Sequence, residues 1–293
     1  MNLSCLPTKD INFKSVKNTK KDTKMTNALP AVGLVSMVYF VKGGSKKSSY
    51  SSSKSGSSDG VVGKTLMWSD EFDKDGSVDS SKWSFEILHV NNEVQQYTTS
   101  QSNAYVANGS LVLKAIAQSD GTITSARLVS RGKFEFTYGT LVVRARCPGG
   151  VPNGGWPAIW CLGSKGEWPS GMEIDMMEYA PGGWGNNSAA TVHWGSNYTD
   201  HHQYGTTKYC DISQWNIWKL DWSASQMTIS LNNEVMLTYK NNNAYSFPAQ
   251  TGQNGAKQYI ILNYAVGGTM GGNAIDTSKF PATMEIDYVR YYQ

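Results

Sequence analysis

From residue 66 onward, short apolar and β-branched runs alternate with polar positions and are separated by Gly, Asn, Asp and Ser turns. Alternation with a period of two is typical of strands with one buried face, and no long helical periodicity competes with it. Many short strands at this spacing predict an all-β sandwich or jelly roll. Asn232 and Asn233 predict a two-residue hairpin turn. The expected strands lie within residues 110–117, 138–147, 157–163, 172–179, 188–194, 217–223, 227–239, 258–268 and 283–292.

The stretch "GMEIDMMEYA" breaks this alternation at one place. In a regular strand Glu173 and Asp175 share a face, but Glu178 falls on the other. A helix does not unite them, because five residues separate Glu173 and Glu178 by roughly 140° around the axis. A β-bulge at Met176 or Met177 shifts the parity and returns Glu178 to the face of the other acids. Such bulges are common beside active sites; the alternative is a solvated acidic face on an edge strand.

Composition divides the chain near residue 60. Residues 1–60 carry ten Lys and three acidic residues, a charge near +7, whereas residues 61–293 hold sixteen basic and twenty acidic residues and all ten Trp. Because residues 43–60 are mostly Gly, Ser and Lys, we expect a disordered tail and linker before one folded domain over 61–293. The folded part is mildly acidic, so a nucleic-acid partner, which requires a basic folded surface, is not expected.

An apolar run occupies residues 28–41 and follows four Lys within residues 17–24. This pattern matches a signal peptide, and the run is short for a membrane span. We therefore expect a secreted or cell-surface-attached protein, in which 28–41 is a cleaved signal or a membrane tether. Translation from Met25 would give the signal a more usual start, and a merely disordered tail is the alternative.

Three acids on one strand face suit the hydrolysis of a sugar acetal. A retaining enzyme needs a proton donor at the leaving oxygen and a second carboxylate at the anomeric carbon, about 5–5.5 Å apart. Asp175 between them would hold Glu178 protonated by its charge and orient Glu173. Tryptophan rings suit the apolar faces of pyranose units, although core packing is the alternative for any one ring. Five Trp crowd this third of the chain: Trp156, Trp160, Trp168, Trp184 and Trp194.

Two other patterns bear less on catalysis. The tripeptide Glu-Ile-Asp recurs at residues 285–287 without a third acid, which indicates a closing strand with Asp287 in a structural role. The His pair at residues 201–202 lacks ligand spacing and is expected in a loop rather than at a metal site. Cys161, in "AIWCLG", is expected to be a small buried residue.

The sequence "WPSGMEIDMMEYA" closely resembles the signature of glycoside hydrolase family 16, in particular of its laminarinase-like members, whose motif carries the extra residue of the bulge. The resemblance covers roughly residues 66–293. Its other segments are "WSDEF" (68–72), "NNEVQQYT" (91–98), "ANGSLVLKA" (107–115), "SARLVSRGKFEFTYG" (125–139), "GGWPAIWCLG" (154–163), "TVHW" (191–194), "LNYAVGG" (262–268) and "IDYVRYYQ" (286–293).

This resemblance implies a concanavalin-like β-jelly-roll sandwich with a concave sugar cleft, so that 61–293 would be the catalytic domain. It also implies retaining endo-hydrolysis of a β-glucan. By position in the motif, Glu173 matches the nucleophile, Glu178 the acid/base and Asp175 the assisting acid. The residues that match substrate-binding positions of the cleft are Asn92, Arg127, Trp156, Trp160, Trp168, His193 and Asn263.

Many relatives carry a calcium ion on the convex side, so the resemblance implies a structural Ca2+ here while catalysis needs no cofactor. Asp287 is the expected side-chain ligand, with backbone oxygens near Glu71 and Gly109. One departure from the family pattern is Met172, which replaces a common Gly and could alter a subsite.

We therefore expect a monomeric endo-β-1,3-glucanase acting on β-glucan polysaccharide. Mixed-linkage β-1,3-1,4-glucan is the main alternative substrate. Agar or carrageenan activity ranks lower, because "NNEVQQYT" and "LNYAVGG" resemble the glucanase branch. A non-catalytic lectin or carbohydrate-binding module on the same sandwich is the alternative of another class. Such a protein would be free to lose its acids, whereas this chain keeps all three.

Overall fold

The computed structural model describes residues 59–240 and 257–293. The predictions for residues 1–58, including the apolar run at 28–41, fall outside the described residues. In the described part of the chain, no helix combines the length and the apolar character that crossing a membrane requires.

Ten of the described strands form one sheet, in which most neighbouring strands are antiparallel. Along its strand β17, buried and partly buried positions alternate over most of the length. In pairing order they are β15 (Glu234–Lys240), β14 (Gln226–Leu231), β13 (Asn216–Trp222), β8 (Gly139–Arg146), β17 (Ala282–Tyr292), β5 (Ser110–Ala117), β6 (Ile123–Ser125) and β3 (Gln95–Tyr97), with β1 (Leu66–Asp70) beside β17 and β4 (Ala104–Ala107) beside β5.

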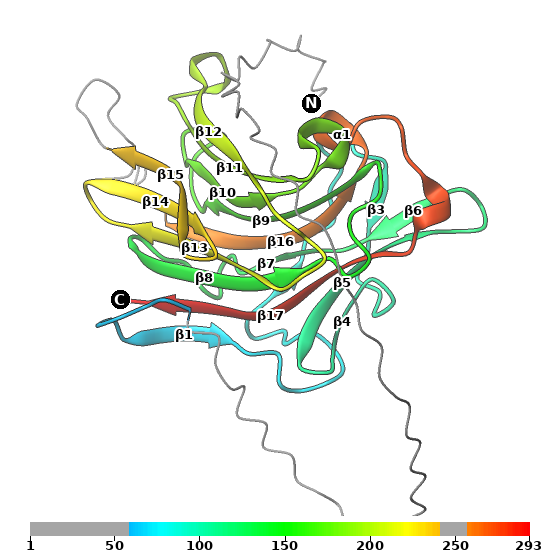
Figure 1. Cartoon of the computed structure of the whole chain (residues 1–293), viewed down its shortest axis with the longest axis horizontal. Coiled ribbons are helices and arrows are strands. Elements are labelled where there is room, and N and C mark those ends of the chain that lie inside the picture. The colour runs from blue at the N-terminus through cyan, green and yellow to red at the C-terminus, as the bar shows by residue number, and fades with distance from the viewer. Residues whose placement is uncertain (1–58, 241–256) are drawn as a thin grey trace, which may run out of the picture. The chain divides into compact units, whose positions relative to one another are not determined.

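The second sheet has seven strands within the described residues, and Figure 1 shows its middle strands curving in the same sense. In pairing order they are β12 (His202–Tyr209), β11 (Asn187–Trp194), β10 (Glu173–Glu178), β9 (Gly155–Gly163), β16 (Gln258–Val266), β7 (Arg127–Val129) and β2 (Ser84–Phe85). The helices are short: α1 (Pro181–Trp184), η1 (Tyr198–Asp200), α3 (Gly268–Gly271) and η3 (Thr277–Lys279).

The main core lies between the two sheets. Leu141 and Val143 of β8 belong to the same buried cluster as Ile159 of β9, Ile174 of β10 and Leu262 of β16, and all five are 0% exposed. Full burial of an aliphatic side chain of this size stabilises the fold by about 1.5–3 kcal/mol. The inner face of each sheet is thus committed to packing, which leaves the outer face of the seven-stranded sheet for polar side chains.

The strand predictions are confirmed, and so is the hairpin. Asn232 and Asn233 join β14 to β15 and have φ of 52° and 64°. A two-residue hairpin turn of this type requires positive φ at both positions. The prediction missed the short strands β1, β2, β3, β4, β6 and β7. It also missed β12, an edge strand whose residues are mostly exposed and polar, so no apolar alternation marked it.

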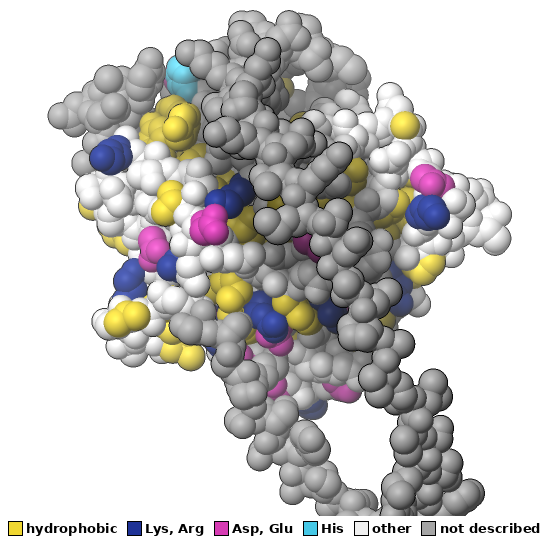
Figure 2. Space-filling view, in the orientation of Figure 1, with side chains coloured by type: hydrophobic (Ala, Val, Ile, Leu, Met, Phe, Trp, Pro, Cys, Tyr) yellow, Lys and Arg dark blue, Asp and Glu magenta, His cyan; other side chains and the backbone are white. Residues whose placement is uncertain are grey.

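The face of the domain shown in Figure 2 carries Lys and Arg side chains interspersed with Asp and Glu among its described residues. Among the described residues, several opposite charges pair directly, as Lys208 does with Glu234 at 2.6 Å. This face therefore does not present the single-signed basic patch on which nucleic-acid binding depends.

Candidate active site

The bulge on β10 is present where the alternation required it. The pairing of β10 with β11 shifts by one residue between Asp175 and Glu178, and its pairing with β9 shifts between Asp175 and Met177. Met176 and Met177 are both 0% exposed and point into the main core. Two consecutive core-facing residues thus return Glu178 to the face of Glu173, and all three acids line one hollow.

Each glutamate accepts a hydrogen bond from a tryptophan. Trp168 Nε1 donates to Glu173 Oε2 at 2.8 Å, and Trp156 Nε1 donates to Glu178 Oε1 at 3.0 Å. Trp156 lies on β9 beside β10, whereas Trp168 lies in the segment that leads into β10. Both bonds orient the carboxylates and favour their ionised forms.

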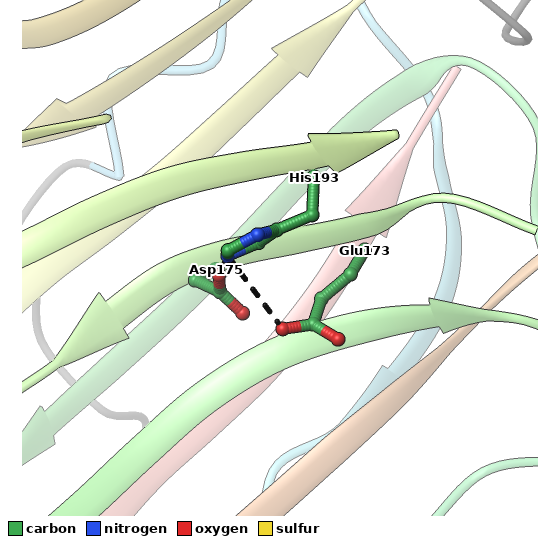
Figure 3. Close-up of side chains that lie close together, drawn as sticks. All are labelled: Glu173, Asp175 and His193. Carbon is green, nitrogen blue, oxygen red and sulfur yellow. Dashed lines mark ion pairs between the residues drawn. The ribbon is translucent and has the colours of Figure 1, made fainter. Parts of the chain in front are cut away.

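The third acid faces an imidazole. His193 of β11 places Nε2 at 3.1 Å from Asp175 Oδ2 and 3.8 Å from Glu173 Oε1, and Figure 3 shows the three side chains converging. On the other side of the ring, His193 Nδ1 lies 2.9 Å from His201 Nε2. The His201 ring also packs 4.5 Å from the Trp168 ring, so the loop before β12 reaches into the site.

The pKa values of the two glutamates are both raised. Burial, and next the charge of Asp175, raise the pKa of Glu178 to about 8. The same causes raise the pKa of Glu173 to about 7, although the charge of His193 and the Trp168 hydrogen bond act in the opposite direction. A raised pKa keeps a carboxyl protonated near neutral pH, which a general acid requires.

The two imidazoles diverge in the same surroundings. Burial acts to lower the pKa of His193, but contact with Asp175 and the charges of Glu173 and Glu178 raise it to about 9. Burial and the charge of His193 lower the pKa of His201 to about 4. A cationic His193 therefore donates Nδ1–H to a neutral His201 and faces the carboxylates with Nε2.

Polar and aromatic side chains of the neighbouring strands form the wall of this hollow. Trp160 Nε1 donates to Asn263 Oδ1 at 2.7 Å, and the Arg127 guanidinium stacks 4.7 Å over the Trp160 ring. Glu86 anchors Arg127 through a 2.7 Å contact to Nε. Of the predicted substrate-binding residues, the structure thus brings Arg127, Trp156, Trp160 and Asn263 around the acids, with Trp168 and His193 touching Glu173.

Asn92 is not among the residues that line the hollow; its neighbours Asn91 and Glu93 are. Asn92 is exposed with φ of 56°. Glu93 is 4% exposed and accepts a hydrogen bond from Tyr97 Oη at 3.1 Å, and Tyr97 in turn accepts one from Asn263. Sequence reasoning missed Glu93 and Tyr97, because buried Glu93 is polar and the apolar Val94 is exposed, so hydrophobic alternation gave no signal here.

The other two tryptophans of the expected sugar platform are not among the residues that line the hollow. Trp194 is 7% exposed and belongs to the main core between the sheets. Trp184 of α1 packs against a small cluster that contains Trp156, Ala180 and Ala265. For Trp194, core packing was therefore the correct alternative.

Met172, the departure from the family pattern, has φ of 66°, in the left-handed region that favours glycine. Its side chain is 0% exposed and points into the main core. This backbone conformation explains why a glycine is common at this position in the family pattern. The buried Met172 side chain does not reach the sugar cleft. The expectation that Met172 alters a subsite is wrong.

The residues implied for calcium do not form a ready set of oxygen ligands. Asp287 Oδ2 accepts a hydrogen bond from Arg144 at 2.6 Å, and the Glu71 carboxylate is bidentate with Arg290 at 2.8 and 2.9 Å. Asp287 borders a hollow together with the turn around Gly109, while Glu71 borders another. Calcium binding stays a prediction, and an ion there would compete with Arg144 for Asp287.

Within the described ranges, one group of His, Cys, Asp and Glu side chains has the geometry to hold a metal ion. Its members are Glu173, Asp175 and His193, whose ligand atoms all lie within 4.8 Å of one another. The group is part of the acid cluster itself.

Comparisons with known proteins agree with this site. The family model described as Glycosyl hydrolases family 16 matches residues 91–289. The chain is 33% identical over 250 residues to a beta-glucanase of Rhodothermus marinus, covering 78% of this chain and 85% of that protein. It is 30% identical over 265 residues to glucan endo-1,3-beta-glucosidase A1 of Niallia circulans, covering 80% of this chain but only 38% of that relative.

A similar solved structure is a variant of LamA from Z. galactanivorans in complex with laminaritriose and laminaritetraose. It superposes with a TM-score of 0.66 at 34% identity, covering 78% of this chain and 99% of that one. The two-sheet architecture and this structural likeness confirm the predicted β-jelly-roll sandwich.

Proposed function

The chain belongs to glycosyl hydrolases family 16 and is a glycoside hydrolase, and from this premise we propose that it cleaves β-1,3-glucan internally with retention of configuration. One observation carries the proposal: the bulge on β10 brings Glu173, Asp175 and Glu178 to one hollow. Two carboxyl groups on one cleft face, one as acid and one as nucleophile, are what double displacement requires.

In the first step, Glu178 protonates the glycosidic oxygen while Glu173 attacks the anomeric carbon. The bond to the leaving sugar breaks, and a covalent glycosyl-enzyme forms. In the second step, Glu178, now ionised, takes a proton from water, which attacks the same carbon and releases Glu173. The raised pKa of Glu178 suits the first role. Each step uses side chains of this chain and water.

Asp175 and His193 support this exchange. The negative charge of Asp175 raises the pKa of Glu178, after burial the largest contribution, and so keeps the acid protonated. His193 offsets part of that charge beside Glu173 and so favours the ionised nucleophile. At each glutamate the charge of Asp175 raises the pKa and the charge of His193 lowers it, so the two side chains oppose each other.

The cleft wall suits a pyranose chain. The rings of Trp156 and Trp160 offer apolar faces, and Arg127 and Asn263 offer hydrogen-bond donors next to the acids. A β-1,3-glucan is favoured because the similar LamA structure binds laminaritriose and laminaritetraose, and because the Niallia circulans relative is named an endo-1,3-beta-glucosidase. Mixed-linkage β-1,3-1,4-glucan is the alternative substrate.

The test is digestion of laminarin, lichenan, cellulose, agarose and carrageenan, with product sizes by chromatography and the first-formed anomer by NMR. Laminarin should yield oligosaccharides of several lengths with the β-anomer first. Faster cleavage of lichenan would assign the mixed-linkage activity instead. Cleavage of agarose or carrageenan, or binding of all five polymers without cleavage, would refute the proposal.

We also propose that the enzyme acts outside the cell, because an apolar run at 28–41 follows a cluster of Lys. These residues lie outside the described part of the chain. Cell fractionation and N-terminal sequencing of the protein made by its native host test this. Uncleaved protein found solely in the cytosol would refute it.

A further inference from the structure

The acid cluster contains three atoms that face one another from two strands. Glu173 Oε1 and Asp175 Oδ2 of β10 lie 3.8 and 3.1 Å from His193 Nε2 of β11, and Figure 3 shows the carboxylates and the imidazole edge converging. Around an ion with metal–ligand distances of about 2.0–2.2 Å, tetrahedral ligands stand about 3.3–3.6 Å apart. The two separations to His193 Nε2 already lie close to this spacing, and all three ligand atoms lie within 4.8 Å of one another.

The imidazole is held from behind. His193 Nδ1 lies 2.9 Å from His201 Nε2, and the two rings are stacked with centroids 5.1 Å apart and planes 18° apart. A metal ion would displace the Nε2 proton of the cationic His193 to solvent, and the ring, still donating Nδ1–H to His201, would then bind the ion through the Nε2 lone pair. A partner at the second nitrogen is the arrangement that orients metal-bound histidines.

Asp175 supplies an independent observation. Its side chain is buried, with 2% of the residue exposed, and the cationic group beside Oδ2 is His193 Nε2 at 3.1 Å. Buried carboxylate oxygens are ordinarily satisfied by donors or by cations. Asp175 shares this one imidazole with Glu173, so a divalent ion would add positive charge to a cluster of buried carboxyl groups that has little of it.

We propose that Glu173, Asp175 and His193 form a binding site for a divalent transition-metal ion of the zinc class, and that the bound ion inhibits hydrolysis. Two oxygens and one imidazole nitrogen suit Zn2+, which takes three protein ligands and one open position. Ca2+ and Mg2+ require six or more oxygen ligands or several retained waters, so they fit poorly. His201 would be a positioning residue that acts through His193.

Inhibition rests on the proposed function, because the ion would occupy the oxygen of Glu173 that attacks the anomeric carbon. Binding itself does not rest on it. Metal binding can therefore be measured without substrate, and the two claims fail separately.

The binding experiment uses Zn2+ alone in calorimetry and Co2+ alone in visible absorption, on the full chain and on Glu178→Gln, which leaves the three ligands intact. Both proteins should bind one ion, with the absorption of four- or five-coordinate Co2+. His193→Asn should weaken binding at least about a hundredfold, and His201→Asn about ten- to a hundredfold. Melting curves confirm that the variants are folded.

The chain offers a matched control. His202 Nε2 lies 3.1 Å from Asp200 Oδ1, the same separation as in the buried pair, but both side chains are exposed. His202→Asn should therefore bind Zn2+ as the unchanged protein does. Equal affinity in the unchanged protein and His193→Asn, or a loss in His202→Asn as large as in His193→Asn, overturns the site.

The activity experiment measures laminarin cleavage with and without Zn2+. The ion should raise the apparent KM and leave kcat at saturating substrate unchanged, and a chelator should restore the rate. Zn2+ should inhibit His202→Asn as strongly as it inhibits the unchanged protein. Binding of Zn2+ without inhibition overturns the inhibitory role. If laminarin is not cleaved, the proposed function fails while the calorimetric and Co2+ results still decide the metal site.

Discussion

The tripeptide Glu-Ile-Asp occurs on β10 and again on β17, and the two copies have opposite surroundings. In both copies the register of strand pairing shifts next to the tripeptide. The shift comes directly after Asp175 in the first copy and falls at Asp287 in the second. In each copy the Ile is 0% exposed in the main core and the acids face outward. Local sequence and local geometry are therefore nearly the same.

Their partners differ. On β17, Arg146 of β8 pairs with Glu285 at 2.7 Å and Arg144 pairs with Asp287 at 2.6 Å. Each acid of that copy has a cation of its own, and Trp215 packs over both arginines.

On β10 the acids have few cations to share. Glu173 and Glu178 accept N–H bonds from tryptophans, and one imidazole lies between Glu173 and Asp175. Burial with insufficient positive charge raises the pKa of both glutamates, whereas a paired arginine is a structural contact. The comparison teaches that neighbouring strands, and not the motif, decide which copy can do acid–base chemistry.

The largest expected contrast between the copies is in catalysis. Glu173→Ala should lower kcat at least about a thousandfold, because it removes the nucleophile. Added azide should restore turnover and give a glycosyl azide of inverted configuration. The matching variant of the second copy, Glu285→Ala, should keep activity within about twofold, since its partly exposed ion pair is worth about 1 kcal/mol or less. Equal losses in both variants would contradict the distinction.

The bulge gives the next largest effect. Deleting Met177 restores strict alternation and keeps three acids on one face, but it moves Glu178 along the strand by about 3.3 Å. Because catalytic geometry is sensitive at about 1 Å, kcat should fall at least about a hundredfold with substrate binding partly kept. Met177→Leu, which keeps residue count and apolar volume, should be nearly silent.

An insertion between Asp175 and Met176 tests the same parity from the other direction. It should be more harmful than the deletion, because it sends Glu178 to the core face. An insertion variant that retains full activity on laminarin would show that the catalytic pairing does not depend on the bulge.

A smaller effect, on the pH dependence of kcat, is expected to distinguish the tryptophan beside the first copy from the tryptophan beside the second. Trp156 donates to Glu178, and this bond lowers the pKa of that carboxyl. Trp156→Phe removes the donor and keeps most of the ring, so the pKa rises further. The acid then stays protonated to higher pH, and the alkaline limb of kcat, expected near pH 8, should move up by about 0.5–1 pH unit.

Trp215→Phe is the control for that pH profile, because Trp215 stacks on arginines of the second copy and touches no catalytic acid. Its alkaline limb should not move. A downward shift in Trp156→Phe would mean that the N–H bond favours the protonated acid instead.

The smallest effect concerns stability alone. Asp287→Asn removes the charge that pairs with Arg144 and should cost about 0.5–1.5 kcal/mol of unfolding free energy in urea titrations. Laminarin cleavage should stay within about twofold. Loss of activity with unchanged stability would place the second copy in the catalytic machinery.

Much of the site followed from the sequence alone. Side chains alternate with a period of two, so the spacing of Glu173, Asp175 and Glu178 already required one bulged residue at Met176 or Met177. The same local rule placed most strands and the Asn232 hairpin. These features depend on neighbours along the chain, and the sequence states those neighbours directly.

Contacts between distant segments were decided by the tertiary structure. Pairing of β10 with β11 placed His193 beside Asp175, and the loop before β12 placed His201 behind it, although that edge strand carries no apolar pattern. Arg144 reached Asp287 only because β8 and β17 pair across 143 residues. Such contacts depend on sheet register and loop path, which many cooperating core contacts determine together, so no single local pattern encodes them.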